Sequence, residues 1–541
     1  MTGPDQPLFR RSTTWWRLAV ALAVALFIGA VARFYIPGKG FTSLILFGEN
    51  FASGRLTQLA DVDYFSSEDS FGYDGQFYAQ LAVQPNLRDP ALNDALDNLP
   101  YRARRMLFCW TAYALGLGQP AWVLHVFSLQ NVVCWLALAV LLLRWFPPVS
   151  GSNFLRWAGV LFSVGVIFSV RGSLVDAPSL LLIAGAMACL EAGRPWLAAA
   201  GLGVAGLGRE TSLLAGGALA WPADRSLKGW GAVLGRGLLA VAPLTLWLAY
   251  LAALLKAPGL DSGARNFALP FTHLVWKIET AFAALFTPAP SPLPALSSFT
   301  MVATLLAQFL FFALRPRWRD PWWRLGAAYA VLMVFLGRAV WEGEPGAASR
   351  VLLPMQLAFN LTVPRGGRWF AVLLLGNLSA IGSVWVFQPP LYEEPILEGP
   401  PALLTDRVHG RTMRLTLDDQ WLPARHSHWD SWRWTTGTAT VVVHNPHPFP
   451  LRATLTFRAS TATPRGLRVT IAGTECWRAA LTTARLDVPP LHLTLFPGDT
   501  PIRFETDRPG DPPGTPFASY PIACRIFDLK LRVDPPSAAP P

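Results

Sequence analysis

Carboxylates and arginines beside long apolar segments are the side chains in this sequence that could do chemistry. Asp74 stands between an aromatic residue and a glycine in a long polar loop, Arg209 interrupts an apolar stretch, and Arg350 precedes another one. The guanidinium group of arginine presents paired donors that suit a phosphate, and a carboxylate can take the proton of a hydroxyl. These residue types together predict a cavity that holds a phosphate and deprotonates a hydroxyl.

The acidic candidates also have structural interpretations. Asp74 could cap a helix that begins near Gln76. Asp176 lies at the start of an apolar segment, where a carboxylate favours a helix N-terminus, so we expect it to act as a cap. We expect the adjacent pair Glu68 and Asp69 to be solvated loop charges, although Asp74 would become a structural residue if this pair were catalytic.

Two arginines have the same double interpretation. Arg209 could simply be neutralised by Glu210, or it could bind a phosphate while Glu210 orients it. Arg350 could form an interfacial ion pair with Glu342 or Glu344, or it could be a second phosphate ligand.

The composition indicates what must position these groups. The chain has 541 residues, of which 52% are hydrophobic and only 15% charged, and its mean hydropathy is +0.34. In a soluble domain about a quarter of all residues are charged, so the chain is predicted to be an integral membrane protein. About eleven apolar segments approach the length needed to span a bilayer. They cover 15–36, 121–143, 154–170, 174–192, 195–208, 211–221, 230–255, 297–314, 322–341, 349–364 and 369–387.

The distribution of charge predicts the orientation of these spans. Lys and Arg near span ends stay in the cytoplasm, and with a cytoplasmic N-terminus the inner segments hold 15 basic and 4 acidic residues. The first outer loop, 38–104, holds 9 acidic and 5 basic residues. Much of the net charge of +11 is therefore topological, which excludes nucleic-acid binding as its explanation. An amphipathic stretch at 269–286 is consistent with a helix on the outer interface, or with a plain connector.

The C-terminal part differs in composition from the rest. Residues 389–535 contain short Val-, Thr- and Leu-rich segments separated by Pro-Gly and Asn-Pro turns, which predicts an extracytoplasmic all-β sandwich followed by a frayed tail, 536–541. Cys476 and Cys524 both fall in this domain, and the spacing alone does not decide whether they are bridged. The tryptophan-rich stretch 429–434 is expected to pack in the core rather than to stack on sugar rings.

One motif of the first outer loop resembles a known family. Residues 73–82 follow the pattern aromatic-Asp-Gly-x-aromatic-Tyr-x-x-aliphatic-Ala, which is similar to the first external loop of the GT-C superfamily of membrane glycosyltransferases. The resemblance is greatest to the branches that use polyprenyl-phosphate sugars, the mannosyltransferase- and arabinosyltransferase-like enzymes. Arg209-Glu210-Thr211 and the Arg-x-x-x-Pro segment at 350–354 also resemble segments of such proteins, so that the likeness covers 15–388.

The resemblance implies a function for the candidate residues. Asp74 would be the catalytic base, and Arg209 and Arg350 would bind the phosphate of the donor. Residues expected to support them are Tyr73, Tyr78, Glu210, Glu342 and Glu344. The first loop lacks the adjacent acidic pair at Asp74 that many members carry, so a divalent metal is not indicated and no cofactor is expected.

The sequence thus predicts a GT-C-like helical membrane domain, 1–388, followed by the β-sandwich. Its expected reaction moves a sugar from a polyprenyl-phosphate donor to the hydroxyl of a glycan or lipid acceptor, with inversion. The composition favours the bacterial inner membrane, with the N-terminus in the cytoplasm and the C-terminal domain in the periplasm. Two alternatives are a non-catalytic scaffold of the cell envelope with a glycan- or protein-binding β-domain, and a transporter of a lipid-linked substrate. Against a transporter, the two halves show no clear internal repeat.

Overall fold

The architecture comes from a computed structural model of the chain. It describes residues 7–36, 38–67, 70–222, 226–255, 264–287, 291–390, 396–406, 411–422, 425–426, 431–512 and 521–535. The chain divides into a helical unit (1–35, 41–67 and 71–389) and a β-rich unit (36–40, 68–70 and 390–541). Glu68 and Asp69, Trp429, and the tail 536–541 lie outside the described residues.

Five helical segments of the helical unit are long and apolar enough to cross a membrane, among the residues that the structure describes. They are Thr14–Ala32 of α1 (Pro7–Ala32), α6 (Pro120–Leu142), α11 (Leu227–Leu255), α13 (Leu293–Leu314) and Gly367–Val386, which comprises α18 (Gly367–Leu375) and α19 (Ala380–Val386). A sixth is added if α7 (Gly151–Leu161) and α8 (Val164–Arg171), bent by 42°, form one span. The expected count of about eleven spans is therefore not confirmed.

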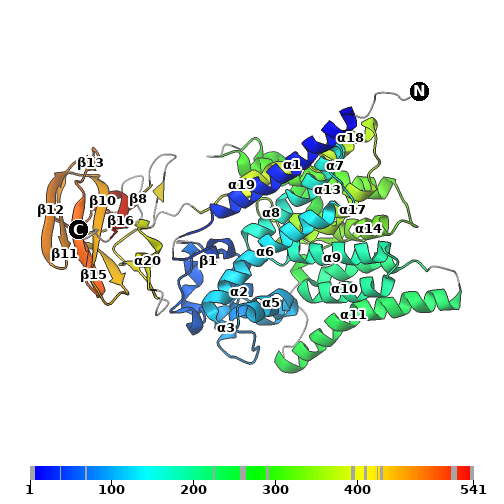
Figure 1. Ribbon diagram of the computed structural model, residues 1–541, viewed down its shortest axis with the longest axis horizontal. Helices are drawn as coiled ribbons and strands as arrows, with labels where there is room; N and C mark the ends of the chain where they lie inside the picture. Colours follow the sequence, from blue (N-terminus) through cyan, green and yellow to red (C-terminus); the bar gives the residue numbers. More distant parts are fainter. Residues whose placement is uncertain are drawn as a thin grey trace. The chain divides into compact units, whose positions relative to one another are not determined.

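The other apolar segments form shorter helices. They are α9 (Asp176–Glu191), α10 (Pro195–Gly208), the 3₁₀ helix η5 (Glu210–Leu219), α14 (Pro321–Phe335), α16 (Ala348–Val351) and α17 (Leu353–Thr362). The helix α10 packs between α9 and α11 (Figure 1). The hydropathy of an apolar segment of this length is the same whether the segment faces lipid or other helices. The excess of expected spans comes from these internal helices.

Buried amides hold several of these helices together. Gln308 on α13 donates hydrogen bonds to the side chain of Gln356 on α17 (2.7 Å) and to the main-chain oxygen of Gly376 (2.8 Å). Gln356 in turn donates to Asn377 (2.9 Å), and Asn377 donates to Asn360 (2.9 Å). Polar side chains at such positions bind helices together because nothing else in an apolar interior satisfies them.

The long first loop is a packed layer of short elements. It contains η1 (Thr42–Ile45), β1 (Phe47–Gly48), η2 (Glu49–Gly54), η3 (Thr57–Leu59), β2 (Ser66–Ser67), α2 (Gly75–Val83), α3 (Leu92–Ala95) and α4 (Leu99–Arg102), and it ends in η4 (Ala103–Arg105), which α5 (Leu107–Leu115) follows. Two buried glutamines of α2 tie it together. Gln76 accepts a hydrogen bond from the main-chain N–H of Gly48 (3.2 Å), and Gln80 accepts one from Leu56 (3.1 Å) and donates to Ala95 (2.7 Å).

The remaining helices of the helical unit lie between α11 and α16 in the sequence. The helix α12 (Thr272–Ala284) forms within the amphipathic stretch 269–286, after η6 (Ala264–Asn266), and α15 (Arg338–Trp341) follows α14. Lys277 of α12 donates a hydrogen bond of 2.7 Å to the main-chain oxygen of Gly343. This bond fixes α12 to the segment between α15 and α16.

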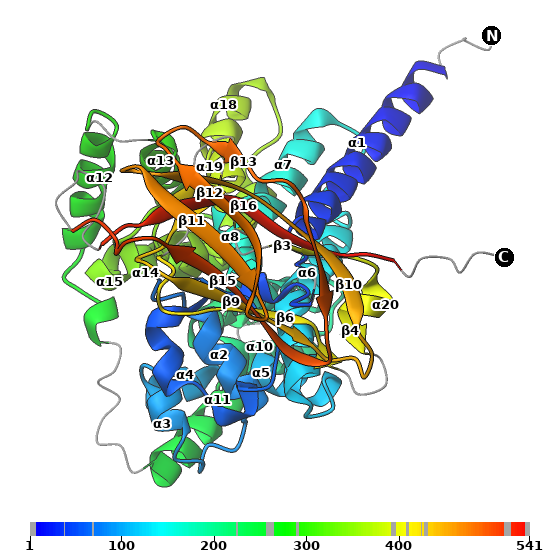
Figure 2. The same cartoon turned by 90° about the vertical axis from the view of Figure 1, so that its left-hand side faces the viewer.

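The β-rich unit contains two larger antiparallel sheets and little helix (Figure 2). The first has the order β13-β10-β16-β8-β7, with β14 on β10 and β3 parallel to β16, and the second has the order β12-β11-β15-β9-β6. The bounds in the first sheet are β3 (Ile396–Glu398), β7 (Arg425–His426), β8 (Ser431–Trp434), β10 (Leu451–Thr461), β13 (Leu486–Asp487), β14 (Leu491–Leu495) and β16 (Cys524–Val533). Those in the second are β6 (Arg414–Leu417), β9 (Ala439–Asn445), β11 (Arg465–Ile471), β12 (Thr474–Leu481) and β15 (Gly498–Thr506). The short α20 (Pro401–Leu404) precedes the pair β4 (Thr405–Asp406) and β5 (Arg411–Thr412).

Alternate residues of both sheets supply one shared core. The strand β9 buries Ala439, Val441 and Val443, and leaves the residues between them half-buried. Trp434 is also buried, as expected for part of the stretch 429–434, with the Arg525 guanidinium 4.5 Å from its ring centre. The two cysteines of the unit are not bridged: Cys476 is exposed, and Cys524 is buried and shares a hydrogen bond with Thr435.

Candidate active site

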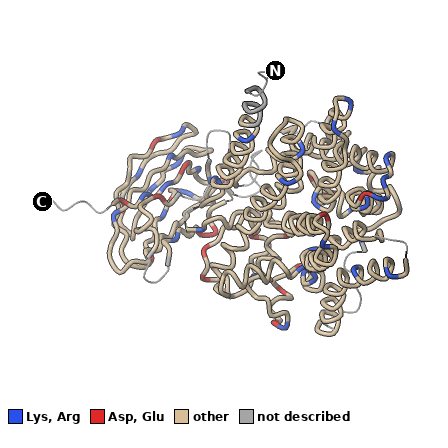
Figure 3. Tube along the Cα trace, turned by 45° about the vertical axis from the view of Figure 1, so that its right-hand side comes forward, with Lys and Arg blue, Asp and Glu red and all other residues tan. Residues whose placement is uncertain are grey.

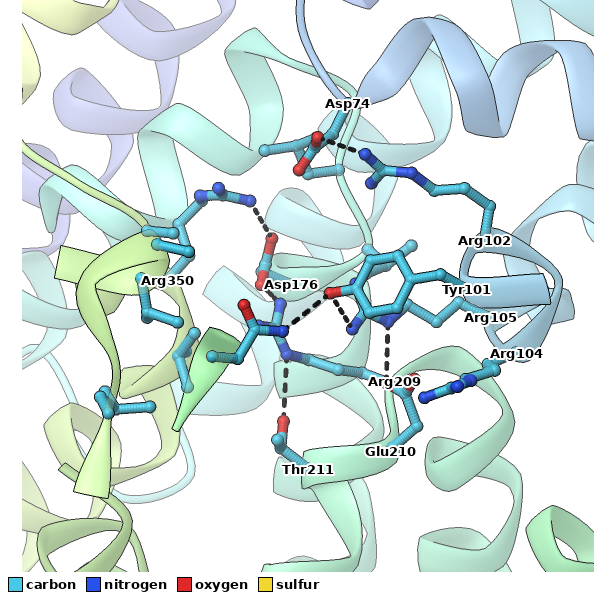
Figure 4. A pocket seen from close by; sticks show the side chains of 18 of the residues that line it. Asp74, Tyr101, Arg102, Arg104, Arg105, Asp176, Arg209, Glu210, Thr211 and Arg350 are labelled. Atoms are coloured by element: carbon cyan, nitrogen blue, oxygen red, sulfur yellow. Dashed lines mark hydrogen bonds and ion pairs between the residues drawn. The ribbon is translucent and has the colours of Figure 1, made fainter. Parts of the chain in front are cut away.

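A cavity of about 770 Å³ brings the candidate residues of the helical unit together (Figure 4). Its walls come from the first loop, the start of α9, the junction of α10 with η5, and the segment from α14 to α16. The polar lining contains Asp74, Tyr78, Asp97, Tyr101, Arg102, Arg104, Arg105, Asp176, Arg209, Glu210, Glu342 and Arg350. Phe267, Leu332, Leu336 and Val340 make one side apolar.

Two glycines fix the turn that carries Asp74. Gly72 has a φ of +66°, which L-residues with a side chain rarely adopt. A Cβ atom on Gly75 would lie 2.1 Å from the main-chain oxygen of Gly172 and 2.6 Å from that of Ile45. The backbone around Asp74 can therefore approach its neighbours this closely only because Gly75 has no side chain.

Asp74 precedes α2 but its side chain does not cap the helix. Its carboxylate instead accepts a hydrogen bond of 2.8 Å from Nη2 of Arg102, and 35% of the side chain stays exposed. The capping interpretation of Asp74 is therefore wrong in this structure. The carboxylate lies at the wall of the cavity, where a substrate can reach it.

Arg102 is itself held rigidly. It donates two hydrogen bonds to Asp97, from Nε to Oδ1 (2.9 Å) and from Nη2 to Oδ2 (2.7 Å), and its guanidinium lies 5.0 Å from the ring centre of Phe77. Burial alone would raise the pKa of Asp74, but the charges of Arg102 and Arg350 and the hydrogen bond from Arg102 outweigh burial and lower that pKa. Asp74 is therefore ionised at neutral pH.

Asp176 is the centre of the deeper part of the cavity. It is the first residue of α9, but the expectation that it caps this helix is wrong, because the N-cap residue is Val175 and no side chain caps the helix. Its carboxylate instead forms ion pairs with Arg209 and with Arg350, the latter at 3.1 Å between Oδ2 and Nη1. The Asp176 side chain is only 1% exposed. A buried carboxylate between two arginines fixes both guanidinium groups in position.

Arg350 also joins this cluster to the turn of Asp74. Its Nη2 donates a hydrogen bond of 2.8 Å to the hydroxyl of Tyr73, and its guanidinium lies 5.3 Å from the Tyr73 ring centre. The expected pairing of Arg350 with Glu342 or Glu344 does not occur. Glu342 lines the cavity but is exposed and pairs with Arg338 at 3.9 Å, and Glu344 is exposed and does not line the cavity.

Glu210 has a different partner from the one expected. It forms an ion pair with Arg105, at 2.7 Å between Oε2 and Nε, so Glu210 does not orient Arg209. Arg105 also donates hydrogen bonds to the hydroxyls of Tyr78 (2.9 Å) and Tyr101 (3.1 Å). Tyr78 thus belongs to the site as expected, but through Arg105.

Sequence reasoning missed five ionisable residues of this site: Asp97, Tyr101, Arg102, Arg104 and Arg105. A signal for the arginines exists, because Arg102, Arg104 and Arg105 form a basic run at the end of a mostly acidic loop predicted to be extracytoplasmic, where the Lys/Arg rule predicts few basic residues. Among the described residues, no group of three or more His, Cys, Asp or Glu side chains could hold a metal ion.

Comparisons with known proteins give little more. No family model matches the chain, and no curated protein matches it. Among solved structures, the cryo-EM structure of arabinosyltransferase EmbB from Mycobacterium smegmatis is similar with a TM-score of 0.30 and 10% sequence identity. The match covers 98% of this chain and 66% of that chain, so this chain spans about two thirds of its length. A likeness at this level supports no inference about activity.

Proposed function

We propose that the chain is a membrane glycosyltransferase that moves a sugar from a polyprenyl-phosphate donor to the hydroxyl of an extracytoplasmic glycan or lipid acceptor, with inversion. One observation carries the proposal. A single cavity contains an accessible carboxylate, Asp74, and two arginines, Arg209 and Arg350, that a buried aspartate holds in place. The resemblance of residues 73–82 to GT-C enzymes points to the same reaction.

The reaction assigns one role to each group. The acceptor oxygen attacks C1 of the sugar from the face opposite the phosphate, and Asp74 takes the proton of the acceptor hydroxyl. The bond between C1 and the phosphate oxygen breaks, and its electron pair stays on the phosphate. Arg209 and Arg350 stabilise the charge that develops there, without rearrangement during the reaction, because Asp176 already positions them.

Exposure and pairing favour Asp74 over the other carboxylates as the base. The side chain of Asp176 is 1% exposed and neutralised by two arginines, and Glu210 is paired with Arg105 at 2.7 Å. Asp74 is 35% exposed and lines the cavity. Its lowered pKa makes it a weak base, which suits a transition state with oxocarbenium character, where the bond to the leaving group breaks early.

The apolar side of the cavity favours a lipid-linked donor. Phe267, Leu332, Leu336 and Val340 line the same cavity as the arginines, and isoprenoid chains are hydrocarbon. A hydrocarbon chain gains more from burial against these side chains than the polar groups of a nucleotide sugar do. The donor phosphate would contact Arg209 and Arg350 while the first isoprene units contact the apolar side.

The experiment is release and transfer of sugar from a panel of synthetic polyprenyl-phosphate sugars by purified full-length protein. We expect wild type to act on at least one donor, and Asp74→Asn to lose about a hundredfold or more in rate. Asp94→Asn is the matched control, because Asp94 is an exposed aspartate of the same loop that does not line the cavity.

Two results would contradict the proposal. Equal rates for wild type and Asp74→Asn would remove Asp74 from the mechanism. A folded wild-type protein that acts on no donor of the panel would contradict glycosyl transfer itself and favour the scaffold.

A further inference from the structure

A second cavity, of about 380 Å³, lies at the opposite ends of helices that also border the candidate active site. Asp176 at the start of α9 lines the first cavity and Glu191 at its end lines the second. Similarly, α14 contributes Leu332 to the first cavity and Trp322 to the second. At 1.5 Å per residue, α9 separates the two cavities by roughly 22 Å.

A buried arginine forms one wall of the second cavity. Arg156 is 3% exposed, and its guanidinium donates hydrogen bonds to the main-chain oxygens of Asn360 (2.5 Å), Val363 (3.0 Å) and Pro364 (3.1 Å). These acceptors lie at the C-terminal end of α17 and carry no formal charge. Arg156 is therefore held in place without losing its positive charge.

A second arginine adds to this charge. Arg365 directly follows the carbonyls that Arg156 contacts, lines the same cavity, and repels Arg156 electrostatically. Among the residues that the structure describes, no carboxylate lies within 4.0 Å of either guanidinium group. Two like charges at one cavity without a carboxylate partner favour an anionic ligand.

The one carboxylate of the described lining does not serve as this partner. Oε1 of Glu191 accepts a hydrogen bond from the indole N–H of Trp322 (2.8 Å), and Oε2 accepts one from Trp145 (2.8 Å). Glu191 also pairs with Arg144 at 3.5 Å. The ion pair with Arg144 balances the charge of Glu191, and the two hydrogen bonds hold both indole rings at the cavity.

The sequence positions of the lining residues place the cavity at span ends. The span α6 ends at Leu142, just before Trp145, and the span Gly367–Val386 begins just after Arg365. Tryptophan is enriched at the headgroup level of membranes. Many Lys and Arg positions of the helical unit gather on one side, at the right of Figure 3, as expected for a surface near anionic lipids.

We propose that the second cavity binds the phosphate headgroup of an anionic membrane phospholipid. Arg156 and Arg365 contact the phosphate, and Trp145 and Trp322 lie at headgroup depth. The acyl chains extend into the bilayer beside the neighbouring spans. This site is separate from the candidate active site, and the inference does not depend on glycosyl transfer.

The test measures phospholipid binding to the full-length protein in detergent, by native mass spectrometry and by the thermal unfolding midpoint. The probes are phosphatidylglycerol, phosphatidylcholine and soluble glycerol phosphate. We expect phosphatidylglycerol to bind more tightly than either of the others and to raise the unfolding midpoint. The readout requires no substrate, so its failure is distinguishable from failure of the proposed enzymatic function.

Two arginine variants three residues apart distinguish the cavity from general surface charge. Arg365→Ala removes a group that contacts the phosphate, so affinity for phosphatidylglycerol should fall about tenfold or more. Arg368→Ala is the matched control, because Arg368 is exposed at the start of α18, three residues after Arg365, and does not line the cavity. It should lower affinity by no more than about fivefold, as expected for a charge near an anionic surface.

Three outcomes would overturn the inference. Absence of phosphatidylglycerol binding to wild type would do so directly. Equal losses in Arg365→Ala and Arg368→Ala would assign the binding to surface charge. Binding of soluble glycerol phosphate as tight as that of phosphatidylglycerol would assign the cavity to a soluble phosphate compound instead of a lipid.

Discussion

The position of Asp74 depends on an atom that the chain lacks, the Cβ of residue 75. In Gly75→Ala the added carbon would lie 2.1 Å from the main-chain oxygen of Gly172. An ordinary contact between carbon and oxygen is about 3.3 Å or longer, so the start of α2 must move by roughly 1 Å. The main-chain oxygens of Gly172 and Ile45 belong to packed segments and cannot swing away as the end of a flexible side chain can.

A displacement of this size has a predictable effect on the reaction. Misplacing a reacting group by about 1 Å can lower a rate about a hundredfold. We therefore expect the transfer rate of Gly75→Ala to fall about a hundredfold. The half-saturating donor concentration should change little, since Arg209 and Arg350 lie on other elements. The assay is the initial rate of sugar transfer at several donor concentrations, with the unfolding midpoint measured alongside.

A second glycine provides the control for this prediction. Gly185 lies inside α9, and a Cβ there would meet nothing within 4 Å, so Gly185→Ala should keep the wild-type rate. A wild-type rate in Gly75→Ala would refute the argument that the tight start of α2 positions the carboxylate. An equal loss of donor affinity would show that the substitution disturbs the whole cavity and not the turn alone.

Two further substitutions test the charges of the site. Asp176→Asn should lower the free energy of unfolding by about 3–5 kcal/mol, because removing one member of a buried ion cluster leaves its charged partners uncompensated. A denaturation midpoint equal to that of wild type would contradict this prediction. Arg102→Gln removes a positive charge that lowers the pKa of Asp74, while burial, which raises this pKa, remains. The pKa of Asp74 should therefore rise. Activity that needs the carboxylate is lost as pH falls through this pKa, so the acid limb of the pH–rate profile should move to higher pH. An unchanged acid limb would show that Arg102 does not set the ionisation of Asp74.

The parts of the fold that the sequence predicted are those with a local signal. The change from long apolar runs to short Val- and Thr-rich segments near residue 390 marks the start of the β-rich unit. The number of spans had no such signal. The helices α9, α10 and α14 have 16, 14 and 15 residues and pack among other helices, and hydropathy does not distinguish this environment from lipid.

In the candidate site, too, residues with a local sequence signal could be predicted and residues without one could not. Arg209 and Arg350 could be selected because a charged residue beside an apolar segment is unusual wherever it pairs. Asp74 could be selected because it stands between an aromatic residue and a glycine in the first loop. Their partners could not be selected, because pairing depends on long-range contact. Arg350 meets Asp176 across 174 residues of sequence. Of the nearer neighbours suggested by spacing, Glu342 pairs with Arg338, and Glu344 is exposed and does not line the cavity.

The cluster at Asp176 also affects how the protein is made. Asp176 and Arg209 are synthesised well before Arg350, and all three adjoin apolar segments. During synthesis Asp176 therefore has one arginine partner, and the second arrives only when α16 is complete. Asp176 and Arg209 balance each other in charge, so Arg350 brings a net positive charge to the cluster. The cluster therefore becomes suited to an anion only when α16 has been made and packed.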